Sequence, residues 1–131
     1  MLTTHQGTSH IILSRALHGK NFGPSTALLD WEMTHLGDPI EDLGWVYREL
    51  WSPRRSLPFE DFLSAYEAEA GTSVDRGSLR WYQAFAEVKH SVISLTGARS
   101  FHDGLTLNLR HADRGATVAA FLRRFYELVP T

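Results

Sequence analysis

The sequence predicts a mainly α-helical (α+β) fold in which a short N-terminal β-hairpin precedes a helical bundle. Three observations support this prediction. Apolar residues after Pro39 recur at helical spacing. Two short apolar runs with turn residues between them come before it. The chain has 131 residues, the length of one ordinary domain, so we expect residues 1–131 to form a single domain.

Composition excludes several classes of protein. Hydrophobic residues make up 43% and charged residues 21%, which is typical of a globular chain. No apolar run approaches the roughly 20 residues that span a bilayer, so we expect no membrane association. A formal net charge of -2 gives no basic face for nucleic acid. The absence of cysteine excludes thiolate chemistry and favours a cytoplasmic location.

Residues 1–9 are polar and predict an unstructured lead-in. Residues 10–13 and 26–31 are predicted strands, and the loop between them contains Gly19 and Gly23. Because strands on either side of such a loop commonly pair, these two segments are predicted to form the hairpin.

The first helix is predicted to start at the Gly37-Asp38-Pro39 turn. Asp38 suits the N-cap and Pro39 the first helical position. Trp51-Ser52-Pro53 is expected to stop this helix. A second helix is predicted from Pro58 to a C-terminal Gly71, with one apolar face made by Phe59, Phe62, Leu63 and Tyr66.

A longer helix follows, for which either Asp75 or Ser78 is a suitable start. Gly97 marks either its end or a tolerated weak point. Residues 104–111 carry no clear signal. The last helix is predicted over residues 112–128, with one buried stripe made by Val118, Phe121, Leu122, Phe125 and Leu128.

Asp30 directly follows an apolar strand, and two interpretations of it remain open. It is a hydrogen-bonded turn residue, or it is an oxygen ligand for magnesium, which binds one or two carboxylates together with phosphates and water. Glu32 would point to the same side of a continued strand and is either an acid beside that site or a solvated residue. Asp38 and Asp42 begin a helix, where carboxylates are stabilising, so their predicted role is architectural.

Catalytic residues are not evident. The seven histidines lack a compact ligand spacing, and no Gly-x-Ser-x-Gly nucleophile motif occurs.

The run Leu28-Leu29-Asp30-Trp31-Glu32, followed by Gly37-Asp38-Pro39 and Asp42-Leu43-Gly44-Trp45, resembles the aminoglycoside phosphotransferase family, also called the phosphotransferase enzyme family. The resemblance covers about residues 26–128, and residues 1–25 form a divergent lead-in. It implies the C-terminal part of a kinase-like lobe, with Asp30 as the ligand of nucleotide-bound Mg²⁺ and with Asp38 and Asp42 bracing the site. Relatives of this kind would transfer the terminal phosphate of ATP, or of another nucleoside triphosphate, to a hydroxyl of a small-molecule acceptor.

The resemblance also exposes departures from the family pattern. The family carries His-Gly-Asp and then Asn upstream of the magnesium aspartate. Counting back without gaps places His10 at the histidine, Ile12 at the catalytic aspartate and Leu17 at the asparagine. Isoleucine cannot accept a proton and leucine cannot bind Mg²⁺. Using Asn21 instead would demand a much shorter hairpin.

The nucleotide-holding lobe is also absent from the resemblance. We therefore expect no catalytic residue, no binding of Mg²⁺ and ATP, and no activity from this chain alone. The chain is expected to be either a truncated gene product or half of a complex. As an alternative, it is a helical interaction module that pairs with a partner chain, or with itself, through exposed aromatics such as Trp31, Trp45 and Trp81.

Overall fold

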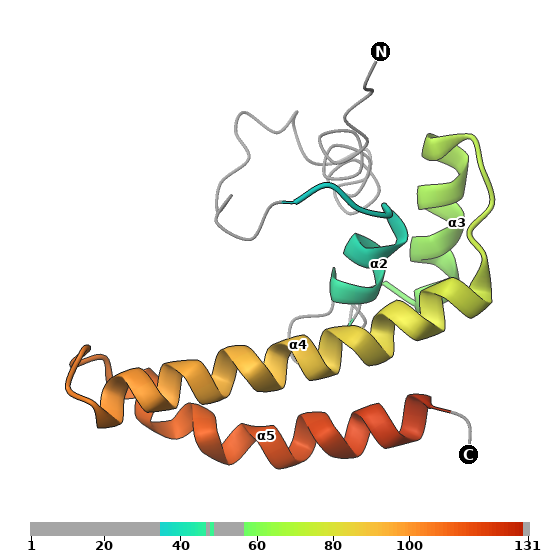
Figure 1. Cartoon of the computed structure of the whole chain (residues 1–131). Coiled ribbons are helices and arrows are strands. Elements are labelled where there is room, and N and C mark those ends of the chain that lie inside the picture. Colours follow the sequence, from blue (N-terminus) through green and yellow to red (C-terminus); the bar gives the residue numbers. More distant parts are fainter. Residues whose placement is uncertain (1–34, 47, 49–56, 130–131) are drawn as a thin grey trace. The chain divides into compact units, whose positions relative to one another are not determined.

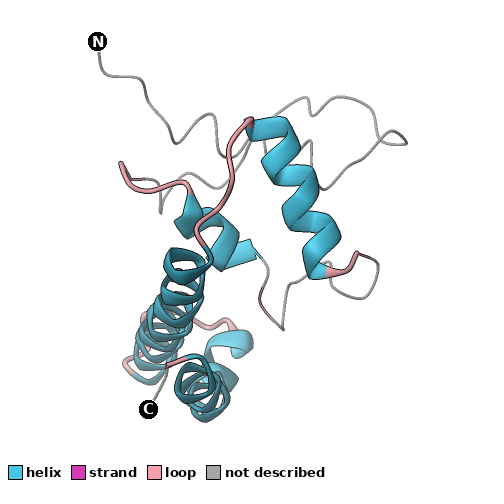
Figure 2. Ribbon diagram, turned by 90° about the vertical axis from the view of Figure 1, so that its right-hand side faces the viewer, coloured by secondary structure: helices cyan, strands magenta, loops and turns pink. Residues whose placement is uncertain are grey.

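The structure is a computed structural model, and it describes residues 35–46, 48 and 57–129. This part of the chain contains four helices and no strand (Figures 1 and 2), which confirms the mainly α prediction for it. The helices are α2 (Ile40–Val46), α3 (Phe59–Ala70), α4 (Arg76–His102) and α5 (Leu109–Leu128). The predicted hairpin and the predicted helix stop at residues 51–53 lie outside the described residues.

The chain divides into two compact units, residues 1–79 and residues 80–131. Helices α2 and α3 and the first turn of α4 belong to the first unit, whereas the rest of α4 and α5 belong to the second. Within the described ranges, none of the helices combines the length and apolar character that crossing a bilayer requires.

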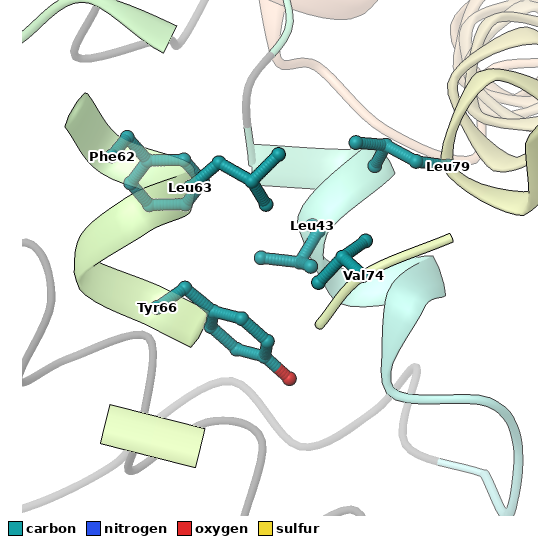
Figure 3. Close-up of a cluster of buried hydrophobic side chains, with 6 residues drawn as sticks. All are labelled: Leu43, Phe62, Leu63, Tyr66, Val74 and Leu79. Atoms are coloured by element: carbon teal, nitrogen blue, oxygen red, sulfur yellow. The ribbon is translucent and has the colours of Figure 1, made fainter. Parts of the chain in front are cut away.

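The first unit has an apolar core between α2, α3 and the start of α4. Leu43, Phe62 and Leu63 are fully buried, and Leu43, Leu63 and Val74 point toward one another in Figure 3. Among the residues that the structure describes, the buried cluster is Leu43, Phe62, Leu63, Tyr66, Val74 and Leu79. The predicted apolar face of the second helix is therefore confirmed, because Phe62, Leu63 and Tyr66 all enter this core.

Both ends of the α3–α4 connection are fixed locally. Gly71 ends α3 in the left-handed conformation, with φ of 68°, as the sequence predicts. The Val74 N–H donates to Glu67 Oε1 over 2.8 Å, which ties the connection back to α3. Asp75 then precedes α4 and accepts from the Ser78 N–H at 2.6 Å, which settles the choice of start in favour of Asp75. The hydrogen bond from the Ser78 backbone, and after it the one from the Ser78 side chain, hold the pKa of Asp75 below its usual value of 3.8.

The second unit is an antiparallel helical hairpin, in which α4 and α5 lie side by side (Figure 1). Arg80 Nε donates to Leu128 O over 2.7 Å at one end of the hairpin. At the other end, a Cβ added to Gly97 would lie 3.3 Å from Arg114 Cδ. Gly97 thus continues α4 and marks a close approach of the two helices, so the suggestion that it ends the helix is wrong.

The final helix differs from its prediction in two respects. It begins at Leu109, because the Asn108 side chain accepts from the Arg110 N–H and caps it. Its expected buried stripe is only partly buried: Phe121 is buried, but Leu122 is 41% exposed. One partner helix covers a narrow face, so it does not reach every apolar position of α5.

Candidate functional site

The candidate site begins at the Gly37-Asp38-Pro39 turn, which delivers the chain into α2. Asp38 Oδ1 accepts from the Ile40 N–H at 2.9 Å, and Asp38 O accepts from the Glu41 N–H at 3.0 Å. These are the bonds of a capped first turn with Pro39 as its first residue. The predicted N-cap role of Asp38 is therefore confirmed. Its carboxylate satisfies a backbone donor, which is a structural task.

A histidine and a glutamate on either side of this turn contact each other. His35 Nε2 and Glu41 Oε2 are 3.0 Å apart, and only 16% of the Glu41 side chain is exposed. A Cβ on Gly37 would lie 3.3 Å from His35 Nε2 and 3.6 Å from Glu41 Oε2, so the missing side chain makes room for the pair. Sequence reasoning missed this contact because it crosses a tight turn and follows no helical spacing.

The end of α2 carries a buried cation. Arg48 is buried, its Nε donates to Trp45 O at 3.1 Å, and its guanidinium lies 4.4 Å from the centre of the Trp45 ring. A guanidinium over an indole face is stabilised by the charge distribution of the ring, and the effect grows when water is excluded. Trp45 is thus half-buried against Arg48, which differs from the uncovered aromatic that the partner hypothesis expects.

The predicted magnesium ligand, Asp30, and its neighbour Glu32 lie outside the described residues. Asp42 is half-buried in the first turn of α2. Across the ranges that the structure describes, no three His, Asp or Glu residues come together to hold a metal ion. The magnesium site and its bracing by Asp38 and Asp42 therefore stay predictions, and the Mg²⁺ assignment depends on Asp30.

The described geometry is a hydrogen-bonded turn at the start of a helix. The Asp38 side chain caps the turn, and His35 and Glu41 form a hydrogen bond beside it. The fully buried Leu43 packs α2 into the core.

Comparison with protein families identifies the chain. The profile of the phosphotransferase enzyme family matches residues 10–82, which is more than half of the sequence. The chain belongs to the phosphotransferase enzyme family. The resemblance drawn from residues 28–45 is thereby confirmed. Neither a comparison with curated proteins nor one with solved structures found a match.

The matched segment of this phosphotransferase-family chain contains Asp30, Asp38 and Asp42, together with α2 and α3. It starts at His10 and ends at Tyr82, early in α4. The family assignment therefore covers the capped turn and the core of the first unit. Members of the family generally use ATP and Mg²⁺.

Proposed function

We propose that this chain carries the magnesium-binding arm and the acceptor-side helices of a kinase-like small-molecule phosphotransferase, and that it does not transfer phosphate by itself. The observation that carries the proposal is the family match over residues 10–82, which includes Asp30 and the capped turn after it. The order of these parts is the one that the family resemblance implies: a metal aspartate, a Gly-Asp-Pro turn and a capped helix.

The proposed inactivity follows from the chemistry of phosphoryl transfer. This reaction depends almost entirely on positioning and on neutralising the charge of the phosphates, so each missing group is costly. Counting back from Asp30 without gaps, as the proposal does, places Ile12 at the catalytic aspartate and Leu17 at the metal-binding asparagine. In that register the chain offers a carboxylate at Asp30 for Mg²⁺ but no group that accepts the proton of the attacking hydroxyl.

Nucleotide and metal would accordingly bind weakly or not at all. Asp30 gives Mg²⁺ one carboxylate, but Leu17 stands in that register where the second protein ligand belongs, and the lobe that holds the nucleotide phosphates is absent from the resemblance. We propose that the chain alone binds neither ATP nor Mg²⁺ measurably. A cytoplasmic location, a small-molecule acceptor and the absence of nucleic-acid and membrane partners belong to the same proposal.

The test uses the purified chain with MgATP and a panel of small hydroxyl-bearing acceptors. We expect no phosphotransfer above background, and no heat of MgATP binding in isothermal titration calorimetry. Asp30→Ala and a control, Asp113→Ala on the exposed surface of α5, should behave identically. Turnover that Asp30→Ala abolishes and Asp113→Ala preserves would overturn the proposed inactivity and establish the metal role of Asp30.

A second candidate function is that of a helical interaction module that acts only with another polypeptide. The observation that favours it is the exposure of large apolar side chains on α4, among them Trp81 at 60%. Surfaces of this kind commonly mark interfaces. A chain that stays monomeric in light scattering, and whose α4 side chains are shielded in that monomer, would contradict this function.

A further inference from the structure

Helix α4 carries an apolar stripe that no part of α5 covers. Five side chains on it are 37–60% exposed: Trp81, Phe85, Val88, Val92 and Leu95. Their spacing is four, three, four and three residues, and Arg99 follows four residues later. We call these six residues the α4 seam. Positions with this spacing lie along one narrow stripe of a helix, as the a and d positions of a heptad do.

The opposite side of α4 faces α5. His90 packs edge-on against Phe121, with ring centres 4.8 Å apart, and Gly97 lies against Arg114 and His111. Since successive residues are about 100° apart around a helix, His90 and Gly97 point away from the α4 seam. Helix α5 therefore cannot cover the seam, and a stripe with heptad spacing is normally buried against another helix.

We propose that the α4 seam binds the α4 seam of a second copy of this chain, in antiparallel orientation. The spacing of the seam (four, three, four, three, four) is its own reverse, so an inverted copy places every seam residue opposite another one. The register is then unique. It pairs Trp81 with Arg99, Phe85 with Leu95, and Val88 with Val92. The resulting interface has two-fold symmetry, the commonest symmetry of protein dimers.

The sizes and charges of the paired residues fit this register. The small side chains of Val88 and Val92 fall at the centre, where two crossing helices approach most closely, and the larger pairs fall outside. At each end the exposed guanidinium of Arg99 meets the exposed indole of Trp81, a favourable cation–π arrangement. A parallel arrangement would instead place Arg99 against Arg99 of the second copy.

The area of the seam sets the expected strength of the dimer. Fully covered aromatic side chains bury about 150–250 Å² each. Two aromatic and three aliphatic side chains that are roughly half exposed thus bury on the order of 400 Å² per copy. Stable interfaces bury about 1,200–2,000 Å² in total, so we expect a weak, concentration-dependent dimer. Because the formal net charge of each chain is only -2, repulsion between two copies is weak.

The first experiment is sedimentation equilibrium of the full chain over a wide concentration range. The apparent mass should rise from 14.8 kDa toward twice that value. Val88→Asp puts a carboxylate in a central apolar layer and should raise the dimer dissociation constant at least about tenfold. The control, Leu107→Asp, changes a leucine that is 91% exposed outside the seam and should leave the constant unchanged. Circular dichroism verifies that both variants keep their helix content.

The second experiment uses the absence of cysteine to test orientation. In the antiparallel register Phe85→Cys and Leu95→Cys chains form a disulfide only when they are mixed. Each residue lies ten positions from its own copy, about 15 Å along the helix, beyond the reach of a disulfide. Cross-linking of each variant with itself would establish a parallel pair and overturn the register. A chain that is monomeric at every concentration, or that is unaffected by Val88→Asp, would overturn the proposal, and neither result bears on phosphotransfer.

Discussion

The two units of this chain bury their apolar residues differently. In the first unit Leu43, Phe62 and Leu63 are fully buried, and α2, α3 and the start of α4 share one aliphatic and aromatic core. In the second unit the buried positions of α4 are mostly small or polar, such as Ala86, Ser91 and Ser94, while five of its large apolar residues are exposed. Similar apolar periodicity therefore builds a self-contained core in one unit and leaves an uncovered face in the other.

The difference follows from the number of elements that surround each helix. A helix that packs against two others buries a wide apolar arc, whereas a helix of a two-helix hairpin buries only the strip that faces its partner. On α4 that strip includes Gly97, which lets the backbones approach closely. Several large apolar residues elsewhere on α4, such as Val92 and Leu95, stay exposed because α5 does not reach them.

The largest expected effect tests the core of the first unit. Phe62→Ala removes a fully buried ring and should lower the free energy of unfolding by about 3–5 kcal/mol, measured by urea denaturation. Val92→Ala in the second unit is the matched control, because Val92 is 57% exposed. It should cost less than about 0.5 kcal/mol at concentrations where the chain is monomeric. Equal losses of unfolding free energy in the two variants would contradict the difference in burial between the two units.

A smaller effect is expected where α4 and α5 approach most closely. Gly97→Leu forces a side chain into the space occupied by Arg114 and His111 and should destabilise the hairpin by about 1–3 kcal/mol in thermal or urea unfolding.

Gly115→Ala is the counterpart of this substitution on α5. A Cβ there would lie 3.6 Å from the Ala98 Cβ, which is an ordinary contact. Because glycine inside a helix is unfavourable, this variant should gain about 0.5–1 kcal/mol. A loss of stability in Gly115→Ala would mean that the helices pack more tightly than the structure shows.

The capped turn of the candidate site should respond next. Asp38→Ala removes the acceptor of the Ile40 N–H and should cost about 0.5–2 kcal/mol in the free energy of unfolding. Asp38→Asn keeps an acceptor oxygen, so its free energy of unfolding should fall by only about a few tenths of a kcal/mol. If Asp38→Asn costs as much as Asp38→Ala, the charge of Asp38 matters for more than the cap.

The smallest effect concerns the start of α4 and depends on pH. The pKa of Asp75 is lowered by the Ser78 hydrogen bonds, so its charged form is favoured in the folded chain. The stabilisation is fully present above pH 3.8, the ordinary value, and is lost as the pH falls through the lower pKa of the folded state.

The matched variant is Asp75→Asn, which keeps the cap acceptor without its charge. The wild type should have a higher unfolding temperature than Asp75→Asn near neutral pH, and the two temperatures should become equal in acid. If the difference in unfolding temperature stayed constant down to the most acidic pH, it would contradict the lowered pKa of Asp75.

Local rules were enough to predict three of the helix ends from the sequence, although the Asn108 cap of α5 was missed. Asp38 with Pro39, Asp75 and Gly71 act through hydrogen bonds and backbone conformations that span a few residues, and the structure confirms each of them. The family assignment was also accessible, because the spacing between the two aspartate blocks is itself a sequence feature. Asp30 and Glu32 lie outside the described residues, so their roles stay predictions.

Tertiary structure alone decided which apolar residues are covered. Helical periodicity places Phe62, Phe85 and Leu122 equally well on apolar faces, yet Phe62 is fully buried and the other two are about 40% exposed. Periodicity reports the side of a helix on which a residue lies, but burial depends on whether another element packs there. The same limit applies to Gly97 and to the His35–Glu41 pair, because close approach between helices and contacts across a turn are set by three-dimensional packing.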